Sequence, residues 1–118
     1  MSSSEDILKR YSTGDRGFAK LELDDKVYDF AGQTLDAVDF SETFIVANFS
    51  GASLVGARFE RANVKTCDFR SANLTGASFK GAAIDGAEFA GAILSEAAFV
   101  GATEQRYVYG DNEMPRGV

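Results

Sequence analysis

Apolar residues recur at every fifth position through most of the chain. Residues 47–101 divide without gaps into eleven fives: ANFSG, ASLVG, ARFER, ANVKT, CDFRS, ANLTG, ASFKG, AAIDG, AEFAG, AILSE and AAFVG. The first position is alanine in ten of the eleven, and the third is Phe, Leu, Ile or Val in all of them. The looser fives YDFAG, QTLDA and VDFSE carry the pattern back to residue 28. The sequence therefore consists mainly of one short repeat.

A five-residue period fits neither a straight strand nor a helix. Residues five apart point to opposite faces of a strand and lie about 140° apart around a helix. The large apolar residues can share one interior only if the backbone bends once in every repeat. Glycine, which permits unusual backbone dihedrals, occupies the fifth position in eight of these repeats. The pattern predicts a coil with one side per repeat.

The central residues of the repeats predict four sides per coil. Read at every fourth repeat, the centres form nearly pure columns of Phe, of Leu, of Phe again and of β-branched residues. A three-sided coil would mix these types within each column. The predicted structural core consists of these stacked centres: Phe30, Leu35, Phe40, Ile45, Phe49, Leu54, Phe59, Val64, Phe69, Leu74, Phe79, Ile84, Phe89, Leu94 and Phe99.

One side of the coil is a residue short. Phe40 and Phe49 are nine residues apart, one fewer than two repeats require. Ile45 at the centre of this side keeps the β-branched column intact, whereas Phe44 at the centre would break it. We therefore expect Ile45 to face inward and Phe44 to face outward.

The first end of the solenoid needs a cap, because each coil packs only on its neighbours. Residues 1–27 are predicted to form a capping helix and a lead-in, with Ser4 as the helix cap and Ile7 on an apolar stripe. Phe18 and Leu23 are five residues apart and are expected to begin an incomplete coil.

The second end is predicted to be closed by a tail of residues 102–118. Glu104 falls where the β-branched column expects an apolar centre, so the coil should stop near Gly101 or Ala102. Three apolar residues of the tail are then expected to lie over the open end: Tyr107, Tyr109 and Met114.

Composition places the chain among single globular domains. Its 118 residues are 45% hydrophobic and 25% charged. Eighteen acids against twelve bases give a net charge of −6, which disfavours direct binding to nucleic acid. The start lacks the pattern of a secretory signal, and no apolar run approaches the ~20 residues of a membrane helix. We expect no membrane association and a cytoplasmic location; the oligomeric state stays open, with a monomer favoured.

Few residues could support catalysis. The absence of histidine excludes histidine acid–base chemistry and the usual zinc sites. Cys67 stands at an inward alanine position and is expected to be an inert, buried thiol. Acid pairs such as Asp24 and Asp25 are expected on a convex, solvated surface, whereas acid–base work needs a concave site. The sequence predicts no enzyme, no metal site and no cofactor.

The outward positions carry the remaining candidates for function. Basic residues gather in the middle coils, and two apolar residues lie on the short side. The simpler interpretation of these outward residues is an ordinary mixed-charge surface. The more specific interpretation is a band of residues around the middle coils that binds a partner. Lone exposed apolar residues are common, so they matter only if they form a patch. The candidate interaction surface comprises Phe44, Val46, Arg58, Lys65 and Arg70.

The recurring A-[DN]-[LF]-x-x motif over residues 28–101 resembles that of the pentapeptide-repeat proteins. The resemblance implies an all-β fold: a right-handed quadrilateral parallel β-helix of about four coils, with a short N-terminal capping α-helix. The lead-in LKRYSTGDRGF is similar to the opening of many bacterial members, especially cyanobacterial ones. The first coil should be wider or less regular, because four early first positions depart from alanine: Tyr28, Gln33, Val38 and Thr43.

Three classes of function fit the sequence unequally. The favoured hypothesis is a noncatalytic binding or scaffold protein with an unidentified protein partner, because a rigid rod with patterned outer faces suits that role. The resemblance adds an alternative, a DNA mimic that binds DNA gyrase, which requires a long and consistently acidic face. The repeats hold nine acids and five bases, and the basic middle interrupts the acidic surface. An enzyme is the least favoured.

Overall fold

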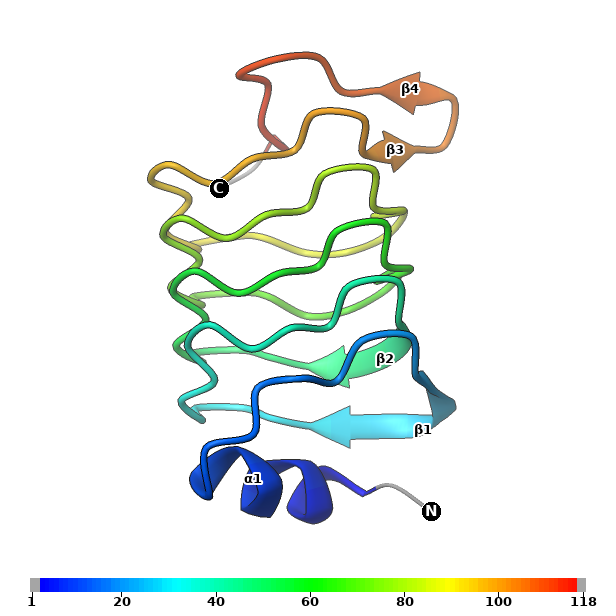
Figure 1. Ribbon diagram of the computed structural model, residues 1–118. Helices are drawn as coiled ribbons and strands as arrows, with labels where there is room; N and C mark the ends of the chain where they lie inside the picture. Colours follow the sequence, from blue (N-terminus) through cyan, green and yellow to red (C-terminus); the bar gives the residue numbers. More distant parts are fainter. Residues whose placement is uncertain (1–2, 117–118) are drawn as a thin grey trace.

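The computed structural model describes residues 3–116 and shows a short solenoid (Figure 1). Helix α1, Ser4–Ser12, covers one end, and a tail that begins after the last coil crosses the other. The molecule measures 36 × 24 × 19 Å, so the coil stack with its two ends forms a short rod. The predicted segments 1–27 and 102–118 include residues 1–2 and 117–118, which lie outside the described residues.

Regular strands are few. Strands β1, Glu22–Asp29, and β2, Phe44–Asn48, pair in parallel in the first two coils. Strands β3, Thr103–Glu104, and β4, Tyr107–Val108, form an antiparallel hairpin after the last coil. Elsewhere a side joins its neighbour through single parallel bridges, because the chain bends before a longer ladder can form. The expected parallel ladders are therefore mostly reduced to isolated bridges.

The spacing of these bridges locates the short side. Above the incomplete first coil, partners are 19 residues apart from the pair of Thr34 and Ser53 to the pair of Phe44 and Asn63, and 20 apart from the pair of Asn48 and Asp68 onward. The change falls within β2, on either side of Ile45. A period of about 20 residues corresponds to four five-residue sides, so the coil is four-sided.

The corner between two sides has a left-handed backbone whatever residue occupies it. Gly86 has a φ of +71°, and Thr66, at the equivalent corner one coil below, has a φ of +61°. A side chain added at Gly86 would come within 3.3 Å of Thr66 Cγ2. Glycine is favoured at these corners because it adopts positive φ without strain, and here it also gives the neighbouring coil room.

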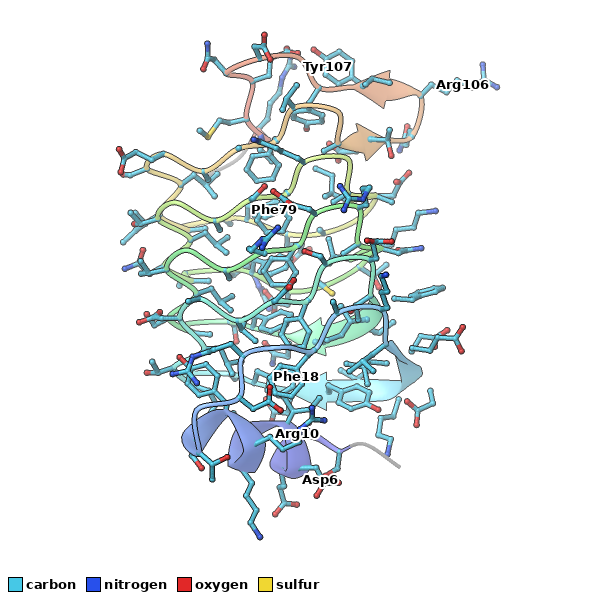
Figure 2. The ribbon with its side chains drawn as sticks, in the orientation of Figure 1. Asp6, Arg10, Phe18, Phe79, Arg106 and Tyr107 are labelled. Carbon is cyan, nitrogen blue, oxygen red and sulfur yellow. The ribbon has the colours of Figure 1, made fainter. Side chains whose placement is uncertain are left out.

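The core is a continuous stack along the solenoid axis. All fifteen predicted centres are buried, and none exposes more than 8% of its surface. Phe69 and Phe89 stack at 5.2 Å between ring centroids and 5° between planes, and Phe79 and Phe99 at 4.8 Å and 4°. The two phenylalanine columns meet edge to face, as in Phe69 and Phe79 at 5.4 Å and 89°. Figure 2 labels Phe79 inside the coils, with Phe18 below it next to the helix.

Helix α1 closes the first end. Ile7 is fully buried against the core, and the Tyr11 hydroxyl donates to the Asp36 carbonyl oxygen at 2.8 Å. The expected cap residue is wrong by one position: Ser3 is the helix cap, and its Oγ accepts a hydrogen bond from the Asp6 N–H at 3.0 Å. Ser4 Oγ instead accepts from the Asp29 N–H at 2.8 Å, which ties the helix to the first coil.

The first coil is less regular than those above it. Parallel pairing begins at Gly17, which faces Asp39, and Phe18 and Leu23 are buried as parts of this incomplete coil. Three of the four residues that replace alanine at first positions are buried inside the coil: Tyr28, Val38 and Thr43. Gln33 is exposed.

The coil runs slightly further than expected at the other end. Thr103 still pairs with Ala83, two residues beyond Gly101. The tail then returns: the Tyr109 N–H donates to the Ala102 carbonyl oxygen at 2.9 Å, and Tyr109 packs on Phe99 at 6.2 Å between centroids. Tyr107 and Met114 are exposed over half and over a third of their surface, respectively, so they cover the end only in part.

Candidate interaction surface

The four sides of the coil present four outer faces. We number each face by the column of outward residues that precede its centres, and bridges link the residues of each column. Face 1 carries Asp29, Asn48, Asp68 and Glu88; face 2 carries Thr34, Ser53, Asn73 and Ile93; face 3 carries Asp39, Arg58, Ser78 and Ala98; face 4 carries Phe44, Asn63, Ala83 and Thr103.

Many acidic and amide side chains in these columns have a structural role. Asp68 Oδ1 accepts from the Arg70 N–H at 2.9 Å, and Asn48 Oδ1 accepts from the Ser50 N–H at 2.9 Å. Asn73 binds the Thr75 N–H in the same way at 3.1 Å. The second position of the repeat therefore favours Asp and Asn because a short acceptor side chain can bind the backbone two residues on. Sequence reasoning treated this column only as a surface stripe.

An ion-pair cluster covers the middle of face 1. Arg70 Nη2 lies 2.8 Å from Asp68 Oδ2, and Arg70 Nε lies 3.4 Å from Glu88 Oε2. The hydrogen bond from Arg70 lowers the pKa of Asp68, and the same bond raises the pKa of Arg70. The positive charge of Arg70 is thus shared between two carboxylates of the same chain.

A second cluster covers face 3. Arg58 Nη2 lies 3.0 Å from Glu60 Oε1, and the Ser78 hydroxyl donates to Glu60 Oε2 at 2.9 Å. Both bonds lower the pKa of Glu60, with the bond from Arg58 contributing more. Arg61 reaches Glu42 on the coil below at 3.3 Å.

The predicted interaction residues therefore do not form one belt. Phe44, Val46 and Lys65 belong to face 4, whereas Arg58 and Arg70 lie on the two flanking faces and are engaged in ion pairs. No ion pair of Lys65 occurs within residues 3–116. Face 4 thus carries the two apolar residues together with a lysine that is in no ion pair among the described residues. Arg58 and Arg70 belong to separate clusters in which their charge is neutralised by carboxylates of the same chain.

Face 4 has an exposed apolar residue that sequence reasoning missed. Leu23 pairs with Ile45 and Tyr28 with Ala47, so residues 24–27 bulge out opposite Val46 alone. Val27 ends this bulge with 67% of its surface exposed, and Phe44 is 41% exposed. The available signal was that residues 24–27, between Leu23 and the first five at Tyr28, do not fit the five-residue period, but this does not say which of them points outward.

Face 2 is the least charged of the four. Its outward columns hold Thr, Ser, Asn and Ile, and Asp36 is bound by the Ser53 hydroxyl at 2.6 Å and the Val55 N–H at 2.9 Å. Val55 and Ile93 are exposed there, two coils apart. They do not form a patch of adjacent residues.

Cys67 lies in the core. It is fully buried, and its Sγ lies 3.2 Å from the Ile45 carbonyl oxygen. Burial raises the pKa of the thiol to about 12, so the reactive thiolate is disfavoured at neutral pH.

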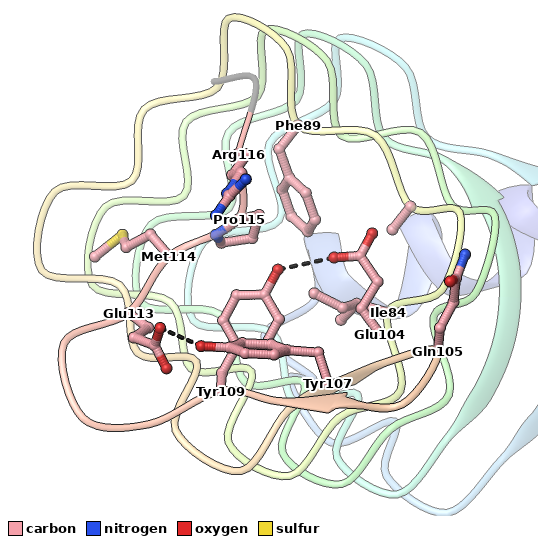
Figure 3. Close-up of a pocket in the computed structure, with 11 residues that line it drawn as sticks. Ile84, Phe89, Glu104, Gln105, Tyr107, Tyr109, Glu113, Met114, Pro115 and Arg116 are labelled. Atoms are coloured by element: carbon pink, nitrogen blue, oxygen red, sulfur yellow. Dashed lines mark hydrogen bonds between the residues drawn. The ribbon is translucent and has the colours of Figure 1, made fainter.

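The sequence led us to expect a convex surface with no concave site, and this is wrong at the tail end, where two cavities occur. One, of about 450 Å³, is lined by Phe89, Glu104, Tyr107, Tyr109 and Glu113, among others (Figure 3). The other, of about 530 Å³, lies between the tail and face 3. They arise because the tail crosses the end of the coil without filling the space on either side.

The carboxylates of the first cavity are engaged. The Tyr109 hydroxyl donates to Glu104 Oε1 at 2.8 Å, and the Tyr107 hydroxyl donates to Glu113. Burial and the bond to Glu104 raise the pKa of Tyr109 to about 12. The pKa of the Tyr107 hydroxyl is likewise raised by its bond to Glu113, so both tyrosines are protonated donors at neutral pH.

Residues 3–116 lack both a clustered set of metal-binding side chains and a membrane-spanning helix. That part of the chain contains no group of three or more His, Cys, Asp and Glu side chains arranged to hold a metal ion. None of the helices within it is long and apolar enough to span a bilayer.

The chain belongs to the pentapeptide-repeat family. The family profile, Pentapeptide repeats, matches in 8 copies over residues 29–81 and 72–103. Members fold as right-handed quadrilateral β-helices, and the four-sided parallel coil described above agrees with that architecture. The resemblance seen in the motif is thus confirmed.

Solved structures of pentapeptide-repeat proteins are similar to this chain. HetL of Nostoc, described as involved in the regulation of heterocyst differentiation, shares 26% identity with a TM-score of 0.51. The match covers 86% of this chain but 47% of HetL, so the chain spans about half of that protein. A protein of the Arabidopsis thaliana thylakoid lumen shares 32% identity over 72% of this chain and 69% of its own, with a TM-score of 0.48. No curated protein matches.

Proposed function

We propose that this protein is a noncatalytic binding module that presents the outer faces of a rigid solenoid to a protein partner. The single observation that carries the proposal is the filled axis: all fifteen centres are buried, so the coils can act on other molecules only from outside. Stacked rings rigidify the coil, which lowers the entropy cost of ordering a surface on binding.

The distribution of polar groups supports a noncatalytic role. The thiol of Cys67 is buried, and the acids of the tail cavity are bound by tyrosine hydroxyls. The outward columns contain short side chains fixed to their own backbone, which offers a partner a preordered surface. The cytoplasmic location expected from the sequence stays a prediction.

A test of this proposal compares capture of proteins from the native cell extract by the wild type and two variants. We expect the wild type to retain at least one protein that the triple variant Phe44→Ser, Lys65→Ala, Arg70→Ala loses. Thr75→Ala on face 2 is the matched control and should capture as the wild type does. Failure to retain any specific protein, or equal retention by all three forms, would count against a role for these outer faces.

The alternative of a gyrase-binding DNA mimic has less support. Mimicry needs an uninterrupted acidic face, but Arg70 lies between Asp68 and Glu88 on face 1, where acids are most frequent. On face 3, Arg58 similarly neutralises Glu60. A supercoiling assay distinguishes the two roles, because a mimic would inhibit or protect gyrase at micromolar concentration, whereas we expect no effect.

A further inference from the structure

Two irregularities of the solenoid coincide on face 4. Nine of the ten phenylalanines are buried, and Phe44 is the exception. Val27 is the most exposed of the large apolar residues within 3–116. Glu22 pairs with Phe44 and Tyr28 with Ala47, so the bulge that carries Val27 borders the same short side. We call Val27, Phe44 and Val46 the lower apolar patch.

The bulge is held in place rather than loose. The Tyr28 hydroxyl donates to Asp25 Oδ1 at 2.8 Å, and the Tyr28 ring is buried. Lys26 Nζ lies 5.7 Å from the centre of the Tyr28 ring and 3.7 Å from Asp25 Oδ2. Bulges next to regular pairing commonly redirect side chains. Here the bulge turns Val27 outward although neighbouring Tyr28 faces the core.

The patch is bordered by the acids of β1 on one side and by Lys65 on the coil above, and the acids outnumber this lysine. Strand β1 carries Glu22, Asp24, Asp25 and Asp29 against Lys26 alone. Lys26 pairs with Asp25, and within residues 3–116 no ion pair engages Glu22, Asp24 or Asp29. By contrast, Asp68 and Glu88 on face 1 and Glu60 on face 3 are each paired with an arginine. Exposed apolar side chains and free acidic charge therefore occur together at this patch.

We propose that the lower apolar patch and the acids of β1 bind a partner segment that combines lysine or arginine with an aliphatic or aromatic side chain. The inference rests on the proposed function and names the partner's chemistry. Charge complementarity argues for this occupant: acids on the rim attract bases, while the apolar centre is desolvated. Nucleic acid and anionic lipid would be repelled, and two copies of this chain would oppose like charges.

The test selects a random 12-residue peptide library displayed on phage against the full-length wild-type protein. We expect enriched peptides to carry net positive charge with at least one aliphatic or aromatic residue. The best peptide should bind Val27→Ser, Phe44→Ser at least 10-fold more weakly. Val55→Ser, which removes an exposed apolar residue from face 2, is the matched control and should bind as the wild type does.

A charge variant keeps the test independent of the apolar substitutions. Glu22→Gln with Asp24→Asn should weaken the peptide several-fold and flatten the dependence of its affinity on salt. Glu96→Gln with Asp111→Asn removes two acids from the far end of the molecule and should change neither. Circular dichroism of each variant checks that the coil is retained.

The outcomes separate this inference from the broader proposal. Acidic or uncharged enriched peptides, or peptides that bind Val27→Ser, Phe44→Ser as tightly as wild type, would overturn the inference while leaving a binding role on another face. A library that yields no specific peptide would count against both.

Discussion

The two ends of the solenoid are closed in different ways. At the first end, helix α1 buries Ile7 and makes hydrogen bonds to residues far along the chain, from Tyr11 to Asp36 and between Ser4 and Asp29. At the second end, the tail beyond Tyr109 is held by local contacts, chiefly Glu113 to Tyr107 and Gly110. Cavities remain on both sides of the tail.

The last coil shows the consequence. Within residues 3–116 the backbone N–H groups of Phe89, Leu94 and Phe99 have no hydrogen-bond partner, although their counterparts Phe69, Leu74 and Phe79 donate to the coil above. Leu94 is 8% exposed, whereas Leu74 is fully buried. A coil has all its backbone hydrogen bonds and a fully buried core only when another layer packs on it both above and below. The first end of the solenoid is better covered in this sense than the second.

The largest effect should come from equal leucine truncations in the middle and at the end. Leu74→Ala is expected to lower the free energy of unfolding by about 2–5 kcal/mol, because a buried leucine leaves a cavity between two coils. Leu94→Ala should cost less, about 2 kcal/mol, since within residues 3–116 no further coil stacks above this slightly exposed side chain. Urea denaturation measures both, with Thr75→Ala as a surface control within about 0.5 kcal/mol. Equal losses would mean that the tail covers the last coil as fully as another coil would.

Truncation of one residue in each cap sharpens the comparison. Ile7→Ala should cost about 2 kcal/mol, because this buried side chain joins the helix to the core. Met114→Ala should stay within about 0.5 kcal/mol, because the tail leaves that side chain exposed. Thermal unfolding followed by circular dichroism gives both values. A larger loss at Met114 than at Ile7 would reverse the assignment of the better-closed end.

Alkaline pH should weaken both ends through one tyrosine each. Burial raises the pKa of Tyr28 and of Tyr109 to about 12, with help from Asp25 and Glu104, respectively. An unfolded tyrosine ionises near pH 10, so the stability held by each protonated hydroxyl is full below about pH 10 and is lost as the pH rises to about 12. The slope is at most about 1.4 kcal/mol per pH unit per tyrosine. Urea midpoints between pH 9 and 11 measure it, and Tyr28→Phe and Tyr109→Phe should each flatten the decline.

The smallest effect is expected at the irregular first coil. Phe44→Ser should change the free energy of unfolding by no more than about 0.5 kcal/mol, because the ring lies outside the core. Ile45→Ala, one residue along, should cost about 2–5 kcal/mol and is the matched inward control. If urea denaturation showed a larger loss of unfolding free energy for Phe44→Ser than for Ile45→Ala, Phe44 would be the inward residue and Ile45 the outward one.

The sequence was most informative where every repeat obeys the same rule. A period of five can align large apolar residues only if each repeat bends, so Phe69, Leu74 and Phe79 had to face one interior. The identity of the columns gave four sides, and the spacing of backbone bridges agrees with that number. The family could be recognised from the same motif because its period is rare among other folds.

The candidate site was less predictable. Phe44 could be placed outside from the column argument, but Val27 could not, because its exposure depends on how β1 pairs with β2. The charges show the same limit: Arg58 and Arg70 look like free bases in the sequence, yet each meets a carboxylate once the chain has coiled.

The repeat alone thus determined which residues face the axis and how many sides a coil has, because those follow from local backbone geometry repeated along the chain. Tertiary structure decided the bulge, the neutralised arginines and the incomplete closure by the tail. Each of these depends on which residues meet across coils or at an end, where no repeating pattern specifies the contact.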